Sequence, residues 1–246
     1  MTPARVDRAR AQAFSRALRR WFRANGRDLP WRRTRDPYHV LVSEAMLQQT
    51  QVSRVVDFYE RFVRRFPTLA ALASAPPRRV RESWEGLGYY ARARNLHALA
   101  RQVAEDGGLP SQPDALQALP GIGRYTAGAV ACFAFERRAS LVDTNVARVL
   151  KRAFAPRVDV KSTKGQKKIW ALADALLPRT GKQAWTHNQA LMELGALVCT
   201  ARVARCDECP VRSQCATGAR RVRPRTYARG NLFDSASLYA RSGDPV

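Results

Sequence analysis

Acidic residues are scarce in this sequence of 246 residues. It has 20 aspartates and glutamates against 43 lysines and arginines, which gives a formal net charge of +23 at pH 7. A charge shell that only keeps a protein soluble normally mixes the two signs, so the imbalance argues against that interpretation. It favours a polyanionic partner, of which nucleic acid is the prime example.

Long apolar runs are also missing. No stretch approaches the roughly 20 apolar residues that are needed to cross a membrane. The start of the chain, with Arg5, Arg8 and Arg10, lacks the apolar segment of a secretory signal peptide. It resembles an organellar transit peptide only weakly, because its amphipathic pattern continues directly into a helix. These absences predict a cytoplasmic protein.

No segment alternates apolar and polar residues for long enough to predict a strand. In residues 51–66, apolar side chains such as Val52, Val55 and Val56 instead recur at three- and four-residue steps, which is the helical period. Glycine- and proline-containing turn signals, among them Gly181, separate such segments. The sequence therefore predicts an all-α fold without internal repeats, with helices over residues 8–22, 37–48, 51–66, 91–103, 126–135, 145–154, 166–177 and 185–198.

Four of the five cysteines lie close together. Cys199, Cys206, Cys209 and Cys215 have the spacing C-x6-C-x2-C-x5-C, and such clustering in a cytoplasmic protein favours metal ligation over disulfides. The spacing alone is compatible with a tetrahedral zinc site and with an iron-sulfur cluster. The fifth, Cys132, lies in an apolar helical segment, which indicates core packing.

Gly121 and Gly123 mark a tight turn between two helices. They stand in the segment Leu-Pro-Gly-Ile-Gly-Arg-Tyr-Thr, which is followed by a helix of small residues. Two glycines separated by one apolar residue permit a sharp turn and leave backbone N–H groups free at a helix N-terminus. That arrangement binds phosphate, although many such pairs are ordinary turns.

Two carboxylates stand at unusual positions. Glu44 shares a helical face with Val40, Leu41 and Leu47, and a carboxylate in an apolar stripe is uncommon. Partial desolvation favours its neutral form, as a general acid requires, while a half-exposed boundary position is the alternative. Asp143 lies between the apolar pair Leu141 and Val142 and the helix predicted over residues 145–154. An N-cap role fits it well, and that role is compatible with a catalytic one.

Taken in order over residues 27–215, these motifs resemble those of MutY-type adenine DNA glycosylases, in the helix-hairpin-helix superfamily that also contains endonuclease III. The resemblance implies a [4Fe-4S] cluster on the four cysteines, whose spacing it matches cysteine for cysteine. It implies double-stranded DNA with a mismatched or damaged base pair as the partner. It also implies that Glu44 protonates adenine and that Asp143, contacted by Asn145, stabilises the oxocarbenium-like sugar.

The same resemblance implies a base pocket and a duplex-probing surface. Tyr89 is expected to wedge beside the opposing base while Gln49 fills the stack, because an extruded base leaves a gap. Gln189 is expected to contact the extruded adenine. The DNA-contacting residues implied in this way are Arg27, Trp31, Arg32, Leu47, Gln48, Gln49, Tyr89, Gly121, Gly123 and Gln189.

Position 125 departs from the bifunctional members of the superfamily. Endonuclease III carries a lysine two residues after the second hairpin glycine, and that lysine attacks the sugar. Because Tyr125 stands here, the prediction is a monofunctional glycosylase with Tyr125 in the active site. We separately expect a monomer that is associated with a bacterial-type nucleoid. A thymine or uracil glycosylase for G·T or G·U pairs and a non-catalytic iron-sulfur DNA-binding protein are the alternatives.

Two helical parts are expected from the resemblance. A six-helix barrel over residues 36–140 carries Glu44 and the hairpin, a cluster domain combines residues 1–35 with 141–217, and residues 218–246 form a basic flexible tail. Only 31 residues follow Cys215. This length predicts a catalytic part without the usual C-terminal NUDIX-like domain, and it gives no expectation of a strong preference for 8-oxoguanine over guanine opposite adenine.

Overall fold

Helices make up the regular secondary structure of the computed structural model, which describes residues 6–219. A single isolated bridge, between Cys199 and Ala204, is the only strand-like pairing in that range. The predicted all-α fold is therefore confirmed. The helices are α1 (Arg8–Asn25), η1 (Pro30–Arg32), α2 (Pro37–Leu47), α3 (Val52–Arg65), α4 (Leu69–Ala73), α5 (Pro77–Ser83), α6 (Ala91–Glu105), α7 (Pro113–Gln117), α8 (Arg124–Phe133), α9 (Thr144–Phe154), α10 (Thr163–Leu176), α11 (Gly181–Leu197) and η2 (Arg212–Gln214).

Short polar side chains set the helix starts. Asp36 accepts hydrogen bonds from the backbone N–H groups of Tyr38 and His39 at 2.8 and 3.1 Å and so caps α2, which satisfies donors that a helix leaves unpaired. Thr180 caps α11 in the same way. The turn predicted at Gly181 is therefore wrong, because α11 begins at that residue. The short helices α4, α5 and α7 were not predicted, since each is too short to show a helical period.

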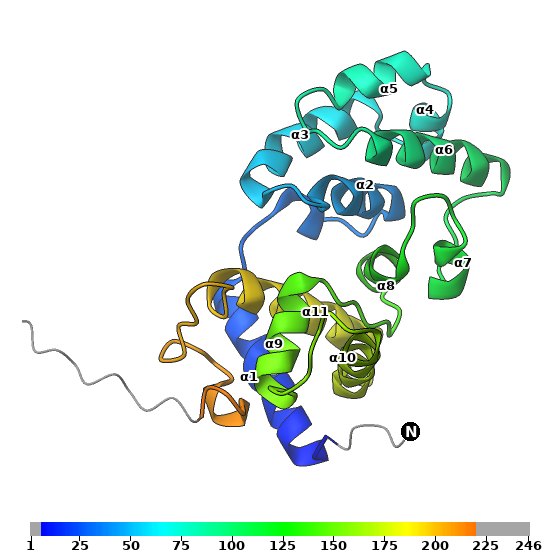
Figure 1. Ribbon diagram of the computed structural model, residues 1–246. Coiled ribbons are helices and arrows are strands. Elements are labelled where there is room, and N and C mark those ends of the chain that lie inside the picture. Colours follow the sequence, from blue (N-terminus) through cyan, green and yellow to red (C-terminus); the bar gives the residue numbers. More distant parts are fainter. Residues whose placement is uncertain (1–5, 220–246) are drawn as a thin grey trace, which may run out of the picture.

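The helices form two groups, which Figure 1 shows one above the other. In the first group α2 packs against α3, α6 and α8, while α4 and α5 pack against α6 and α7 packs against α8. In the second group α1 packs against α11, and α9 packs against α10 and α11. The N-terminal helix thus joins helices from the second half of the chain.

From residue 220 onward, the tail predicted at 218–246 lies outside the described residues. Among the helices of residues 6–219, none has the length and apolar character that crossing a membrane requires.

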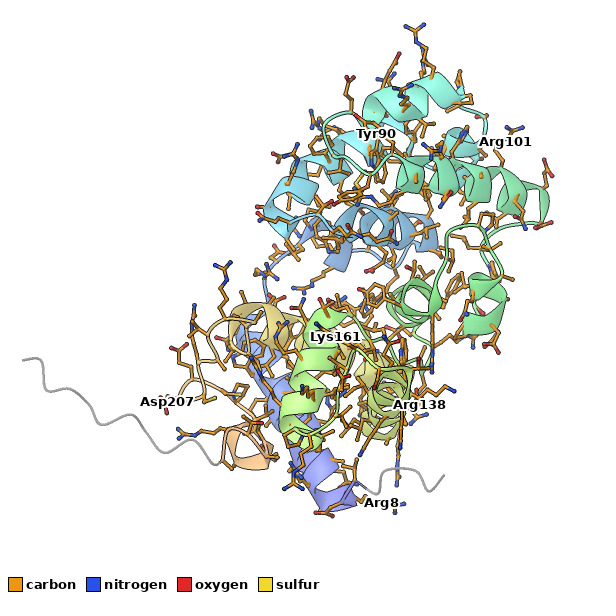
Figure 2. The ribbon with its side chains drawn as sticks, viewed as in Figure 1. Arg8, Tyr90, Arg101, Arg138, Lys161 and Asp207 are labelled. Carbon is orange, nitrogen blue, oxygen red and sulfur yellow. The ribbon has the colours of Figure 1, made fainter. Side chains whose placement is uncertain are left out.

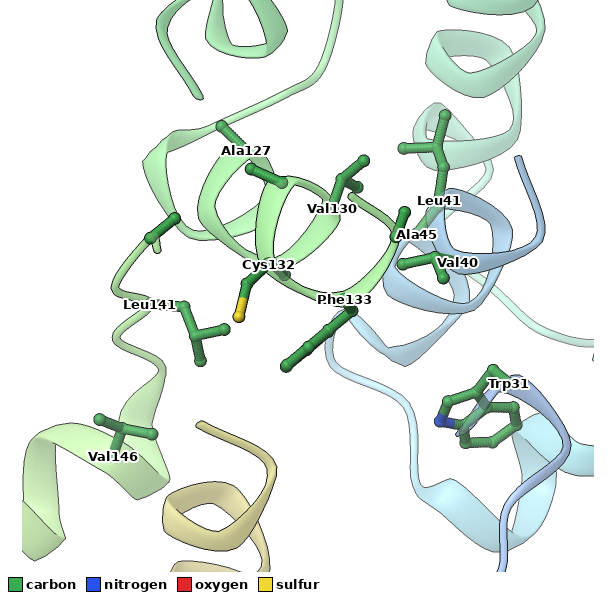
Figure 3. Packing of buried hydrophobic residues seen from close by; sticks show 14 of the residues in the cluster. Trp31, Val40, Leu41, Ala45, Ala127, Val130, Cys132, Phe133, Leu141 and Val146 are labelled. Carbon is green, nitrogen blue, oxygen red and sulfur yellow. The ribbon is translucent and has the colours of Figure 1, made fainter. Parts of the chain in front are cut away.

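The core is densest around α2 and α8. Every residue of α8 from Thr126 to Phe133 is buried, and Figure 3 shows Val130 of α8 near Leu41 and Ala45 of α2. Cys132 on α8 is fully buried, its sulfur accepts a hydrogen bond from Asn188 at 3.2 Å, and burial raises its pKa to about 12. The core-packing role predicted for Cys132 is confirmed, and α8 is held rigidly behind the site.

Candidate active site

A cavity of about 1370 Å³ lies where the two groups of helices meet. Its lining includes both carboxylates that the sequence singled out, Glu44 from α2 and Asp143 from the N-terminus of α9. The fold thus brings together two acids that are far apart in the chain. The other predicted site residues that line the cavity are Arg27, Trp31, Arg32, Leu47, Gln48, Gln49, Tyr125, Asn145 and Gln189.

Glu44 is almost completely buried, with 3% of its surface exposed. This burial raises its pKa to about 7, against the opposing effect of a hydrogen bond with Tyr125, and the nearby charge of Asp143 raises it further. Its Oε2 atom has no hydrogen-bond partner among the described residues. The half-exposed position is therefore excluded, and the carboxyl holds a proton up to near-neutral pH.

Asp143 is the N-cap of α9, as one interpretation of the sequence predicted. Its Oδ1 accepts a hydrogen bond from the backbone N–H of Val146 at 2.6 Å, and its Oδ2 accepts one from the Asn145 side chain at 3.1 Å. Burial raises the Asp143 pKa, while these two hydrogen bonds lower it. The helix N-terminus also stabilises a negative charge, so the capped carboxylate is held in one orientation at the cavity wall.

Arg148 links this acid to the cysteine segment. Its Nη2 donates to the side-chain oxygen of Asn145 and to the carbonyl of Gly195, each at 2.7 Å, and its Nε donates to the carbonyl of Cys199 at 2.8 Å. A Cβ atom at Gly195 would lie 2.7 Å from the Cβ of Asn145. Glycine is therefore needed for the close approach of α11 to the start of α9.

A buried ion-pair network supports the pocket wall formed by α11 and η1. Glu193, which the sequence analysis missed, has no exposed surface. It accepts hydrogen bonds from Arg27 Nε at 2.7 Å, from the Arg27 backbone N–H at 2.9 Å and from Arg32 Nη2 at 2.8 Å. Burial raises the Glu193 pKa, but the hydrogen bonds from Arg27 and Arg32 outweigh it and lower the pKa to about 2.

The same network orients Gln189. Arg32 Nε donates to the side-chain oxygen of Gln189 at 2.8 Å. Because a guanidinium can only donate, the Gln189 oxygen must face Arg32, and its amide nitrogen is left to donate elsewhere. The pocket therefore presents a hydrogen-bond donor at Gln189, which suits an acceptor atom of a bound base.

Three exposed residues other than glycine have left-handed backbone conformations among the described residues: Gln49, Tyr89 and Glu136, of which the first two are predicted site residues. Gln49 has φ of 56° and Tyr89 has φ of 48°, and Tyr89 exposes 60% of its surface. Residues other than glycine seldom adopt this conformation, and it concentrates at functional positions. Tyr89 does not line the cavity, whereas Gln49 does.

Arg92, a second residue that the sequence analysis missed, joins the segments that carry Gln49 and Tyr89. Its Nη1 donates to the carbonyls of Met46 at 2.7 Å and Gln48 at 2.6 Å, at the C-terminal end of α2. Its Nη2 donates to the carbonyl of Gly88 at 3.0 Å, and its guanidinium lies 5.4 Å from the Tyr89 ring centroid. One half-buried guanidinium thus contacts the segments of both exposed residues.

The hairpin lies at the surface beside α6. Gly121 has φ of 75°, and a Cβ atom there would lie 2.7 Å from the Cβ of Asn95. Gly123 is the N-cap of α8. Within residues 6–219 the N–H groups of Gly121 and Gly123 have no backbone partner. They are available to a ligand at a helix N-terminus, as the sequence predicted.

The four cysteines gather around one small cavity beside α9. Cys199, Cys206, Cys209 and Cys215 all line it and are free thiols. Two further donors address the sulfurs: Arg152 Nη1 lies 3.3 Å from Cys199 Sγ, and the backbone N–H of Gly218 lies 3.2 Å from Cys215 Sγ. Among the described residues, no group of three or more histidine, cysteine or acidic side chains is arranged to hold a metal ion.

The comparison with protein families decides the family. A model of the HhH-GPD superfamily of base excision DNA repair proteins matches residues 42–174, which is more than half of the chain. The chain belongs to the HhH-GPD superfamily. The matched range includes Glu44, the hairpin and Asp143, whereas the cysteine segment and Gln189 lie outside it.

Relatives of this HhH-GPD protein include adenine DNA glycosylases. The human adenine DNA glycosylase is 44% identical over 243 residues, which cover 94% of this chain and 44% of the human protein. The adenine DNA glycosylase of Mycolicibacterium smegmatis is 44% identical over 232 residues, with 87% and 77% of the two chains covered. The predicted resemblance to this group is confirmed, and the chain spans less than half the length of the human relative.

A solved structure has a similar fold to the HhH-GPD chain. The structure of a thermostable thymine-DNA glycosylase matches with a TM-score of 0.77 and 30% identity, over 86% of this chain and 97% of that one. The likeness therefore extends over both groups of helices rather than over the hairpin alone.

Proposed function

We propose that this protein is a monofunctional DNA N-glycosylase that removes adenine paired with guanine or 8-oxoguanine in double-stranded DNA, as a monomer in base excision repair. The observation that carries the proposal is the meeting of buried Glu44 and capped Asp143 in one cavity. The 44% identity to adenine DNA glycosylases supports adenine as the base.

The two carboxylates divide the reaction between them. Glu44 gives its proton to a ring nitrogen of the extruded adenine, which makes the base a better leaving group as the N-glycosidic bond breaks. The Asp143 carboxylate stabilises the positive charge that develops on the sugar. Water then adds to the sugar and gives a proton to Glu44, which restores the acid. Tyr125 offers no amine to attack the sugar, so the product is an abasic site.

Base extrusion and base recognition are assigned to different residues. Tyr89 and Gln49 occupy the duplex after the adenine leaves it, because unstacking needs a wedge and the gap needs filling. The Gln189 amide nitrogen, oriented by Arg32, donates to an acceptor of the extruded base. The N–H groups of Gly121 and Gly123 bind a phosphate.

Thymine opposite guanine is the second candidate substrate, with uracil opposite guanine beside it. One observation favours it: the structural similarity to a thymine-DNA glycosylase covers 97% of that chain. Thymine also carries acceptor oxygens that the Gln189 donor suits. The choice of base is therefore left to a direct assay.

A panel of duplexes tests the proposed function. The protein is incubated with A·8-oxoguanine, A·G, T·G and U·G duplexes, with an A·T duplex as the control, and abasic sites are then cleaved with alkali. We expect strand scission at the adenine positions of A·8-oxoguanine and A·G, and only after alkali is added. Borohydride should trap no more than a trace of covalent adduct between protein and DNA. Excision of thymine or uracil instead of adenine would contradict adenine as the substrate base. A strong borohydride adduct would contradict the monofunctional assignment. Scission of no duplex would favour a non-catalytic DNA-binding protein.

We further propose that Cys199, Cys206, Cys209 and Cys215 hold a [4Fe-4S] cluster. Four thiols around one cavity are the donor set that such clusters take. The N–H donors from Arg152 and Gly218 suit anionic sulfur. When bound, the cluster would serve as a structural cross-link for residues 199–215, whose only regular structure is one isolated bridge and a short 3₁₀ turn.

Metal analysis of two matched cysteine variants tests the cluster. We expect the wild-type protein to contain iron and acid-labile sulfide in equal amounts, with the visible absorbance of an iron-sulfur cluster. Cys209→Ser should lose iron, sulfide and absorbance, and its melting temperature should fall, whereas Cys132→Ala should keep all the iron. Zinc without sulfide in the wild-type protein would disprove the iron-sulfur assignment.

A further inference from the structure

Lysine is rare in this protein and unevenly distributed. The chain has six lysines, and five of them lie between residues 151 and 168. That segment has seven basic residues and one acidic residue, Asp159. We use the term lysine strip for these five residues, Lys151, Lys161, Lys164, Lys167 and Lys168; the sixth lysine, Lys182, is on α11.

The lysines differ from many arginines in having no partner. Arg92 and Arg148 are each held by several backbone carbonyls, and Arg27 is paired with Glu193. Within residues 6–219, by contrast, no lysine side chain takes part in any of the hydrogen bonds or ion pairs. The ammonium groups of the strip therefore make no hydrogen bond or ion pair within the described residues.

The lysine strip begins at the active-site cavity. Lys151 and Lys161 line the cavity that contains Glu44 and Asp143. Figure 2 places Lys161 on the side of the second helix group that faces the first group. The charge of the strip thus reaches the entrance through which a base would pass.

From the cavity the strip continues along the first turns of α10. Lys164, Lys167 and Lys168 are spaced by three and four residues, so they share one face of this helix. The opposite face, with Gly165 and Ile169, is buried. All three lysines are exposed and point away from the core.

The backbone around Lys161 is fixed. The N–H of Lys161 donates to the Asp159 carboxylate at 2.9 Å, and the Ser162 hydroxyl donates to the Asp159 carbonyl at 2.9 Å. The same hydroxyl accepts from the N–H of Gly165 at 3.1 Å and so caps α10. The lysines are flexible side chains on a rigid base.

The strip also adjoins the hairpin. The guanidinium of Arg124, the residue after Gly123, stacks 3.8 Å from the ring centroid of Trp170 on α10. Trp170 lines the same cavity as Lys161. The phosphate-binding turn, Arg124, Trp170 and the lysine strip therefore form a continuous surface around one edge of the cavity.

We propose that the lysine strip binds the sugar-phosphate backbone of the DNA duplex whose base enters the cavity. This proposal rests on the proposed function, because that function supplies the DNA duplex. Lysine ammonium groups are point charges on flexible stems that attract phosphates without demanding one geometry. The strip consequently contributes affinity that is independent of sequence and sensitive to salt.

Salt-dependent binding of two matched variants tests the proposal. The strip variant is K161Q/K164Q/K167Q/K168Q. The control variant, R64Q/R65Q/R101Q/K182Q, removes the same charge from exposed residues that do not line the cavity. Binding of an undamaged duplex is followed by fluorescence anisotropy over a range of salt concentrations, and melting curves check that both variants fold.

We expect the plot of log affinity against log salt to become less steep by about 3.6 in the strip variant, since four phosphate contacts are lost and each reduces the slope by roughly 0.9. The control variant should change far less. Equal slopes in the wild-type protein and the strip variant, or equal losses in both variants, would overturn the proposal. Because binding to an undamaged duplex needs no chemistry, failure of the wild-type protein to excise a base from the mismatched duplexes would count against the proposed function and not against the strip.

Discussion

Replacing Glu44 with glutamine is expected to abolish excision while leaving binding of a mismatched duplex intact. Glutamine preserves the size and most of the polarity of the side chain but has no proton to give. General-acid catalysis of this kind contributes about a hundredfold to ten-thousandfold in rate. Single-turnover excision and duplex affinity, measured on the same preparation, separate the two effects.

The pH dependence follows from the raised pKa of Glu44. Burial raises this pKa to about 7 from the ordinary value of 4.5, so the proton that the reaction needs is present below pH 7 and is lost above it. The rate constant for excision is expected to fall as pH rises through 7. A rate that is constant from pH 6 to pH 8.5 would contradict the assignment of Glu44 as the acid.

The same pKa predicts that stability, like the rate, falls as pH rises, but over a lower pH range. Because the folded-state pKa lies above the unfolded one, the wild-type protein loses stability as pH rises from about 4.5 to about 7, and the loss is complete above the folded-state pKa. A shift from 4.5 to about 7 corresponds to roughly 3 kcal/mol. Glu44→Gln should therefore gain stability relative to the wild-type protein between pH 5 and pH 8.5, as urea unfolding at the two pH values would measure.

Local sequence patterns predicted the carboxylates of the site well. Glu44 interrupts an apolar helical stripe, and Asp143 precedes a helix at a capping position, so each is visible within a few residues of sequence. Their meeting in one cavity was expected only from the family resemblance. No pattern along the chain encodes the packing of α2 against α8 or the approach of α9 to that pair, because those contacts join segments far apart in sequence.

The residues that the sequence analysis missed act through long-range contacts. Arg92 stands in a motif that was noticed for its tyrosine, and its role depends on carbonyls of residues 45–48 at the end of α2, more than 40 residues away along the chain. Glu193 did leave a signal: it is four residues after Gln189 in an apolar segment, the same pattern that identified Glu44. Its partners, Arg27 and Arg32, are more than 160 residues away along the chain.

Replacing Glu193 is expected to have the largest effect on stability. Glu193→Ala leaves the Arg32 guanidinium, whose side chain is only 9% exposed, and that of Arg27 without their shared carboxylate. Breaking a buried pair by removing one partner costs about 3–5 kcal/mol, because the remaining charge is uncompensated. Urea unfolding at pH 7 measures the loss. The control is Asp28→Asn, which removes an exposed ion pair with Arg33 and should change stability little.

Acid titration gives an independent test of the same network, including the case in which Glu193→Ala does not fold. The Glu193 pKa is lowered from 4.5 to about 2, so the stability that Glu193 contributes is complete above pH 4.5 and is lost as pH falls towards 2. The milder variant Glu193→Gln should lack this part of the acid dependence. Glu193→Gln should also weaken adenine excision. Without the charged carboxylate, Arg32 is held less firmly against Gln189, so the Gln189 amide that faces the base loses its fixed orientation. A Glu193→Gln protein with wild-type acid stability and wild-type excision would show that Arg27 and Arg32 are positioned by other contacts.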